Sequence, residues 1–450
     1  MSEIKIQTEL PGPKAREHLE RSRRFEPRSM SEQVPIVWDR GWRCYVQDVD
    51  GNVFLDFSSG VLVANVGHSH PRVVEAIRQQ ADRVVNCYDF VNEYRPLLAQ
   101  KLAEITPPNL DRAFILTTGS EAVEAAMKMA RRFTGRKEII AFQGAFHGRT
   151  YGGMSAGGRK SGAGTRGFGP FVPQVHVAPF AHCYRCVFDK TYPECGVWCA
   201  DYLDWFADTE TEGDIAAVIT ETYQGAAGSY VPPKEWMKKV EAWCRRRDAL
   251  FILDEVQASF GRTGKMFCFQ HYDIVPNLLC LGKGISSSVP VSAVAGESRI
   301  MDALEPGSLS STHGGNAFCC RVALENIQVI LDEKLVENAA RLGGLLEKRF
   351  GEMKKRFEIL GDARGLGLAW GLEIVEDKQS KRPASKLAGQ IVEGCWRRGL
   401  LMIAPIGLFG NVLRISPPLV INREELSEGC DILEASFAEA QAGGAVTAST

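Results

Sequence analysis

Several features that mark other classes of protein are missing from this sequence of 450 residues. Neither sign of charge is in excess, since 53 Lys and Arg face 55 Asp and Glu, and no basic patch or tail stands out. Nucleic acid and anionic membranes are therefore not expected as partners. The longest apolar runs are far shorter than the roughly 20 residues of a membrane span. The charged stretch Met1–Arg24 lacks the apolar core of a secretory signal, so we expect a cytoplasmic protein.

A disulfide framework is not indicated either. The chain has 13 cysteines, an odd number, and most of them stand alone in apolar surroundings, as Cys280 does. Reduced thiols are the expectation for such a chain. One cluster could hold a tetrahedral zinc ion, although its spacing is not a common zinc pattern. Thiols packed in an inserted loop are the favoured interpretation and a redox-sensitive disulfide a third, so no metal is predicted for Cys183, Cys186, Cys195 and Cys199.

Short apolar runs that alternate with helical segments dominate the middle of the chain. Such runs are typical of buried strands. Their alternation with helices predicts an α/β fold, in which helices cover both faces of a mostly parallel sheet. The expected strands are residues 113–118, 138–142, 175–178, 216–220, 251–253, 278–281 and 291–295.

The pattern changes on both sides of this region and predicts three parts. Residues 1–70 form an N-terminal segment with a hairpin around Asp50-Gly51-Asn52. Residues 71–335 form the large domain. Residues 336–450 form a smaller α+β lobe, against which the N-terminal hairpin is expected to pack. In this lobe we expect one glycine-interrupted strand over 365–374, a helix over 424–438 and a disordered tail after Gln441.

Polar residues follow four of the expected strands. Ser120, Glu221, Asp254 and Lys283 all stand at carboxyl ends, where ligands bind in open α/β sheets. A desolvated lysine can hold an aldehyde cofactor through a Schiff base. A carboxylate on the neighbouring strand can keep a pyridine nitrogen protonated, which makes the ring an electron sink. A surface lysine and a helix-capping aspartate are the alternatives at these two positions.

Two glycine-containing turns precede helices and could bind a phosphate at the helix N-terminus. They are Thr118-Gly119-Ser120 and Ser311-Thr312-His-Gly-Gly315. A third glycine pattern, residues 162–167, fits G-x-G-x-x-G, but no strand precedes it. A dinucleotide site is therefore not predicted there.

Taken together, the motifs resemble those of class III aminotransferases, which are pyridoxal-phosphate enzymes of fold type I. The resemblance extends over nearly the whole chain, and the motifs follow the order found in that family. It implies a seven-stranded sheet in the large domain. The motifs are Leu55–Gly60, Gly67–Pro71, Thr118–Ala122, Ala145–Thr150, Leu253–Gln257, Gly261–Gly264, Leu281–Gly284 and Thr312–Asn316.

The resemblance assigns roles residue by residue. It makes Lys283 the Schiff-base lysine and proton shuttle, Asp254 the partner of the pyridine nitrogen, and Glu221 a third catalytic residue. It implies an obligate homodimer, in which the second subunit donates Thr312 to the phosphate, and pairing of dimers into tetramers is left open. The cofactor-binding set that it implies is Gly119, Ser120, Phe146, His147, Val256, Gln257, Lys283 and Thr312.

Substrate recognition is also implied by the resemblance. Arg414 matches the arginine that grips the α-carboxylate, and Arg149 matches a position that reads a distal carboxylate in some members. A loop-anchoring ion pair is the alternative for Arg149. Val61 and Tyr88 would line the pocket.

One departure concerns the stretch after Glu221. Many 4-aminobutyrate and ornithine enzymes carry a glutamate there that masks the arginine, where this chain has Ala226. The unmasked Arg414 favours substrates with a carboxylate close to the reacting carbon, and Tyr223 is expected to narrow the pocket.

The expected activity is transfer of an amino group from an amino acid or ω-amine, such as 4-aminobutyrate, to a 2-oxo acid such as pyruvate or 2-oxoglutarate. A racemase or epimerase, or a dialkylglycine-type decarboxylating enzyme of the same family, is the alternative. A metal-binding interaction protein on an inactive scaffold is a third, which the intact cofactor motifs oppose.

Overall fold

Seven strands form the largest sheet in this computed structural model, which describes residues 2–30, 32–157 and 165–447. Neighbouring strands within it run parallel except for β10, which is antiparallel to both β4 and β9. The predicted mostly parallel sheet is thereby confirmed. In spatial order the strands are β4 (Arg112–Leu116), β10 (Ser292–Gly296), β9 (Leu278–Leu281), β8 (Leu250–Asp254), β7 (Ile215–Glu221), β5 (Glu138–Phe142) and β6 (Val175–Ala178).

Both faces of this sheet are buried, which explains why its strands read as continuous apolar runs. Alternate residues of β8 enter different cores: Ile252 packs in one, and Phe251 and Leu253 in the other. On the first face lies α5 (Gly119–Thr134), whose small residues permit close packing, and α8 (Lys234–Arg246) packs with Trp236 and Trp243 on the second.

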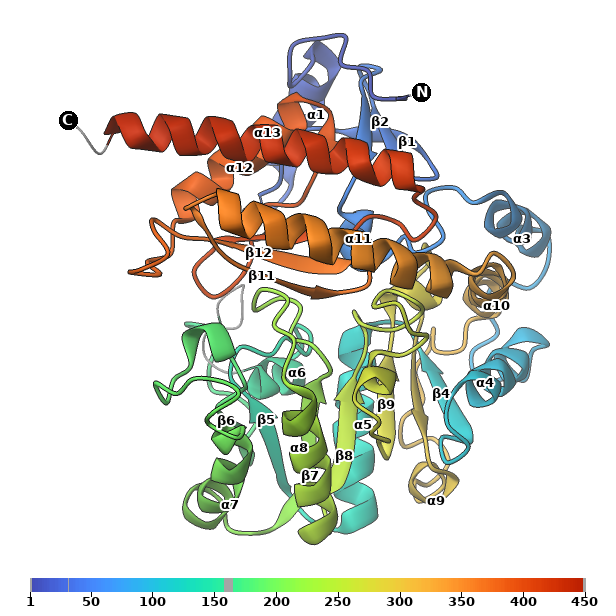
Figure 1. Cartoon of the computed structure of the whole chain (residues 1–450). Coiled ribbons are helices and arrows are strands. Elements are labelled where there is room, and N and C mark those ends of the chain that lie inside the picture. The colour runs from blue at the N-terminus through green and yellow to red at the C-terminus, as the bar shows by residue number, and fades with distance from the viewer. Residues whose placement is uncertain (1, 31, 158–164, 448–450) are drawn as a thin grey trace.

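Helices that surround this sheet are shown in Figure 1. They are α3 (Pro71–Ala81), α4 (Tyr94–Ile105), α6 (Tyr151–Ala156), α7 (Trp198–Glu210), α9 (Ser298–Met301) and α10 (Ala317–Asp332). The four-residue α2 (Ser59–Leu62) precedes them in the chain. Short 3₁₀ helices are η1 (Cys183–Arg185), η2 (Cys268–His271) and η3 (Lys283–Ile285).

Two smaller sheets lie above the large one in Figure 1, with the long helices α11 and α13 beside them. The first joins the N-terminal strands to the C-terminal region, because β13 pairs with β3. Its strands are β1 (Trp38–Trp42), β2 (Tyr45–Asp48), β3 (Val53–Asp56) and β13 (Leu400–Leu401). The second sheet contains β11 (Leu360–Leu366), β12 (Ala369–Ile374) and β14 (Val412–Ile415). The helices of this C-terminal region are α11 (Leu335–Arg356), α12 (Ser385–Arg397) and α13 (Arg423–Thr447).

Two expectations for local structure were wrong, and one helix was not foreseen. The strand expected over 365–374 is a hairpin, because the chain turns at Gly367, whose φ of +53° suits glycine. The N-terminal segment contains α1 (Pro13–Phe25), whose charged sequence buries only Ala15 and so carries little apolar periodicity. Helix α13 continues beyond Gln441, where a disordered tail was expected. Among the residues that the structure describes, no helix is both long and apolar enough to cross a membrane.

Candidate active site

A cavity of about 340 Å³ lies at the carboxyl ends of β7, β8 and β9. It brings together most of the residues that the sequence singled out as catalytic or cofactor-binding. Its lining consists of Val63, Thr117, Thr118, Gly119, Ser120, Phe146, His147, Gly148, Glu221, Asp254, Val256, Gln257, Lys283, Ser288, Val289, Pro290 and Val291.

A buried acid and imidazole form one end of the cavity. Asp254 ends β8, and its Oδ2 lies 2.7 Å from Nδ1 of His147. Its other oxygen accepts a hydrogen bond from the backbone N–H of Val256 at 3.0 Å. Burial alone would lower the pKa of His147, but the hydrogen bond and charge of Asp254 and the charge of Glu221 raise it above the usual value. The pair therefore holds a proton in a buried place.

Lys283 follows β9 and begins a 3₁₀ turn with a left-handed φ of +45°. Its two glycine neighbours let other side chains approach closely, because a Cβ on Gly282 would lie 3.0 Å from Val256 and one on Gly284 only 2.4 Å from Nδ2 of Asn65. Burial lowers the pKa of Lys283 to about 8, although the opposite charge of Asp254 works against this change. A larger neutral fraction of the amine at neutral pH makes it a better nucleophile and base.

Glu221 ends β7 directly opposite Asp254 in the strand register. Its two carboxylate oxygens accept hydrogen bonds from the backbone N–H groups of Phe146 at 2.9 Å and Gly225 at 3.0 Å. Burial raises the pKa of Glu221 to about 7; His147 and the two backbone bonds lower it, while Asp254 raises it further. Its charge therefore changes close to neutral pH.

The N-terminus of α5 also lines the cavity, and it can bind an anion through its backbone N–H groups. Thr118 caps this helix together with Glu121. Space for a ligand depends on two glycines. A Cβ on Gly119 would lie 2.8 Å from Val256, and one on Gly148, which has a φ of +108°, would lie 2.3 Å from Oγ of Ser120.

These residues fit a planar ring with an anionic tail. The helix N-terminus suits a phosphate, the Asp254–His147 pair suits a basic ring nitrogen, and Lys283 suits an aldehyde. Gln257 also lines the cavity, and its carboxamide N–H group is a donor that suits a ring oxygen. The set thus matches pyridoxal 5′-phosphate.

Comparison with known proteins decides the family, because the class III aminotransferase model matches residues 28–437. The chain belongs to the class III aminotransferase family. These enzymes depend on pyridoxal phosphate, so that is the cofactor of this enzyme.

Individual relatives cover almost the whole aminotransferase chain. The leucine/methionine racemase of Thermococcus litoralis is 36% identical over 94% of this chain and 95% of its own. The probable 4-aminobutyrate aminotransferase of Bacillus subtilis is 36% identical over 88% and 92%. The Toxoplasma gondii ornithine aminotransferase, solved with partial occupancy of pyridoxal phosphate, is 29% identical over 96% and 95%, with a TM-score of 0.82.

The predicted substrate-binding residues of this aminotransferase lie outside the cavity lining. Arg414, on β14, is buried and donates from Nη2 to the backbone carbonyl of Gly225 at 2.9 Å. Arg149 is exposed and lies 5.5 Å from the ring of Phe146. Val61 is also exposed at the surface.

Tyr88 and Thr312 lie on two surface loops that contact each other. The hydroxyl of Tyr88 lies 2.9 Å from that of Ser310, and Nδ2 of Asn92 donates to the carbonyl of Gly315 at 3.3 Å. Thr312 is exposed on the second loop. Neither Tyr88 nor Thr312 belongs to the lining of this chain's own cavity.

Sequence reasoning missed part of the cavity wall. Val63, Thr117, Gly148 and the segment Ser288–Val291 line it although no polar or periodic signal distinguishes them. Gly148 alone had a usable signal, because it lies inside the Ala145–Thr150 motif that carries the family resemblance.

The cysteine cluster named in the sequence analysis lies within the described residues. All four thiols are free. Burial raises the pKa of Cys183 to about 11 and of Cys199 to about 12, and the neighbouring thiols raise both further. Within residues 2–30, 32–157 and 165–447, no group of three or more His, Cys, Asp or Glu could hold a metal ion. Part of the glycine pattern at 162–167 lies outside the described residues.

Proposed function

We propose that this enzyme transfers an amino group from an amino acid or ω-amine to a 2-oxo acid such as pyruvate or 2-oxoglutarate. The observation that carries the proposal is Lys283, a half-buried amine of lowered pKa that shares one cavity with Asp254 and the N-terminus of α5. Bound pyridoxal phosphate supplies an electron sink for the carbanion at the substrate Cα.

The chain's own residues bind and orient the cofactor in this proposal. Asp254, supported by His147, keeps a proton at the pyridine nitrogen. The N–H groups of Gly119 and Ser120 bind the phosphate. Val256 and Phe146 would pack against the faces of the ring, and the amide of Gln257 would donate to the ring oxygen. Each of these residues lines the same cavity.

Lys283 is the base in this proposal. Its neutral amine would take the proton from the substrate Cα and give it to C4′ of the bound cofactor. Burial favours the neutral amine, and it also excludes water that would compete for the proton. Glu221 links the cofactor site to the substrate site. One of its carboxylate oxygens accepts a hydrogen bond from the N–H of Phe146, and the other accepts one from the N–H of Gly225.

Arg414 is the proposed site for the substrate α-carboxylate. Its Nη2 donates to a neutral backbone carbonyl, and its Nε has no hydrogen-bond partner among the residues described. Burial lowers the pKa of Arg414, which means that its charge is poorly solvated. A substrate carboxylate would relieve that cost, so we infer a preference for α-amino acids and 2-oxo acids. Arg149 is proposed to read a distal carboxylate.

Racemisation or epimerisation of an amino acid is the second candidate. It is favoured by the leucine/methionine racemase relative and by the alanine/serine racemase of Pyrococcus horikoshii, 34% identical over 98% of this chain. In that reaction Lys283 returns the proton to Cα, and no acceptor is consumed. Dialkylglycine-type decarboxylation needs the same residues and is separated from both by release of carbon dioxide.

A homodimer with shared active sites is proposed as the working form. Its proposed interface contains the loop 84–91, where Phe90 and Val91 are 78% and 82% exposed. Such a patch on a soluble surface is typical of a protein interface. Because Thr312 lies on the loop beside it, a partner subunit docked there would bring its own Thr312 to this chain's phosphate site. Phe90→Asp should yield monomers by sedimentation, with loss of cofactor.

The proposed organisation keeps residues 71–335 as the cofactor domain and 336–450 as the smaller lobe. Residues 1–70 are assigned to the smaller lobe because β3 pairs with β13. A cytoplasmic location and the pairing of dimers into tetramers belong to the same proposal.

The decisive experiment is the visible spectrum of the purified protein with pyridoxal phosphate, beside Lys283→Ala. A colourless wild type would refute the proposal. A screen of amino donors against pyruvate and 2-oxoglutarate, with chiral analysis of the remaining amino acid, follows. Loss of optical purity without any acceptor would show racemisation and exclude transamination as the main activity.

A further inference from the structure

The turn after β7 connects Glu221 to Arg414. Its residues 224–230 are closed by an antiparallel bridge between Gln224 and Tyr230. The carbonyl of Gly225 accepts three hydrogen bonds: from the N–H groups of Gly228 and Ser229 at 3.2 and 3.1 Å, and from Nη2 of Arg414 at 2.9 Å. The position of this one carbonyl therefore decides where the Arg414 guanidinium lies.

Arg364, on β11, holds the same turn from the other side. Its Nε donates to the carbonyl of Gly228 at 2.9 Å, and its guanidinium carbon lies 3.7 Å from the centre of the Tyr230 ring. Gly228 has a φ of +125°, and a Cβ there would lie 2.9 Å from Nη2 of Arg364. Only glycine lets the guanidinium approach the turn this closely.

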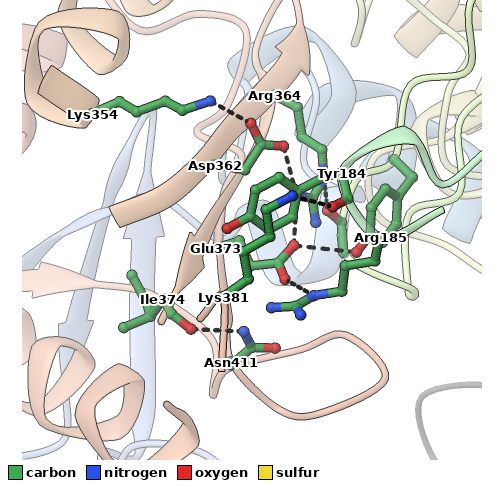
Figure 2. Close-up of polar contacts among 11 residues, drawn as sticks. Tyr184, Arg185, Lys354, Asp362, Arg364, Glu373, Ile374, Lys381 and Asn411 are labelled. Carbon is green, nitrogen blue, oxygen red and sulfur yellow. Dashed lines mark hydrogen bonds and ion pairs between the residues drawn. The ribbon is translucent and has the colours of Figure 1, made fainter. Parts of the chain in front are cut away.

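Two carboxylates fix Arg364 in turn, as Figure 2 shows. Its Nη1 donates to Asp362 at 3.0 Å and to Glu373 at 2.7 Å. Glu373 also accepts from Nε of Arg185 at 2.5 Å, and Lys354 pairs with Asp362 at 2.8 Å. The Arg364 side chain is only 11% exposed. Charged hydrogen bonds in such a place are strong and directional.

We propose that Arg364 is a positioning residue for the substrate carboxylate, acting through Gly228, the turn and Gly225 on Arg414. The inference rests on the proposed role of Arg414. A buried ion network of this kind gives little stability beyond what apolar side chains would supply. What the network adds is a fixed position for the Gly225 carbonyl. Arg414 must donate hydrogen bonds to this carbonyl and to the substrate carboxylate at the same time.

The test compares two variants of the holoenzyme with a matched control. Arg364→Lys keeps the charge but loses the forked donor, and Gly228→Ala pushes the guanidinium away. Arg185→Gln is the control, because Arg185 shares Glu373 but makes no hydrogen bond to the turn in the described chain. Thermal unfolding of each variant shows that it is folded.

The readout uses 2-aminobutyrate and propylamine, two donors that differ only by the carboxylate. Arg364→Lys and Gly228→Ala should raise KM for 2-aminobutyrate about tenfold, the range of effects that act through a neighbouring residue. Values of kcat, KM for propylamine, and both parameters of Arg185→Gln should stay within about twofold. Equal effects on both donors, or an equal effect in Arg185→Gln, would overturn the inference.

Binding of propionate, followed by the visible band of the holoenzyme, separates the inference from the proposed function. A wild type that binds propionate but does not transaminate would refute the function. In that case weaker propionate binding by Arg364→Lys would still support the inference, and unchanged binding would overturn it. If the wild type binds no propionate, Arg414 does not bind a carboxylate, and the inference is overturned.

Discussion

In the cofactor-free protein, replacing Lys283 by methionine should raise the free energy of unfolding at pH 7. The side chain is half-buried in the wall of the cavity, and the structure gives it no hydrogen bond to a carboxylate among the residues described. Methionine has a similar length without the charge, so it removes an expensive, partly desolvated cation and keeps the packing.

The magnitude follows from the pKa of Lys283, which burial lowers from 10.5 to about 8. At 1.36 kcal/mol per unit, this difference corresponds to about 3 kcal/mol. Below pH 8 Lys283 is charged in both the folded and the unfolded chain, so the full free-energy cost of desolvating that charge destabilises the folded state. Between pH 8 and 10.5 the folded state binds fewer protons, so wild-type stability rises with pH. Above 10.5 the cost has vanished.

Urea unfolding of both proteins at pH 7, 9 and 10.5 measures this effect. The advantage of Lys283→Met should be greatest at pH 7 and shrink steadily toward pH 10.5. Lys348→Met, at an exposed position of α11, should change stability little at any pH. An advantage that is independent of pH, or a variant less stable than wild type at pH 7, would refute the reasoning.

Three further changes have defined outcomes. Gly119→Ala places a Cβ 2.8 Å from Val256 and should weaken retention of pyridoxal phosphate about tenfold or more in equilibrium dialysis. Unchanged retention would contradict a phosphate site at the N-terminus of α5. Ala226→Glu should pair with Arg414 and raise KM for α-amino acids about tenfold, with no such rise for propylamine. Glu221 ionises as pH rises through about 7, so Glu221→Gln should remove the inflection near that pH from the pH profile of kcat. If the inflection persists, it arises from another group.

The sequence predicted the large sheet and the cofactor end of the site for a common reason. Strands β7, β8 and β9 are buried on both faces, so the first charged residue marks the end of each strand. Because those ends share one edge of the sheet, the sequence alone places Glu221, Asp254 and Lys283 together.

Other features depend on contacts that no local pattern encodes. The reversed direction of β10 is set by its pairing with β4 and β9, and its apolar sequence suits either direction. The turn at Gly367 looked like an interruption within a strand. The position of Arg414 behind the Gly225 carbonyl depends on the packing of β14 against the turn after β7, which lies far away in sequence.

The pairing of β4 with β10 has a consequence for biosynthesis. Leu116 lies opposite Ser292, so the strand that leads into the α5 N-terminus has its partner much later in the chain. Contacts of such long range form slowly and only when both segments are present. A nascent chain that ends before residue 296 thus has no complete pocket. Pyridoxal phosphate cannot assist the early stages of folding, and it can capture only chains whose synthesis has passed that point.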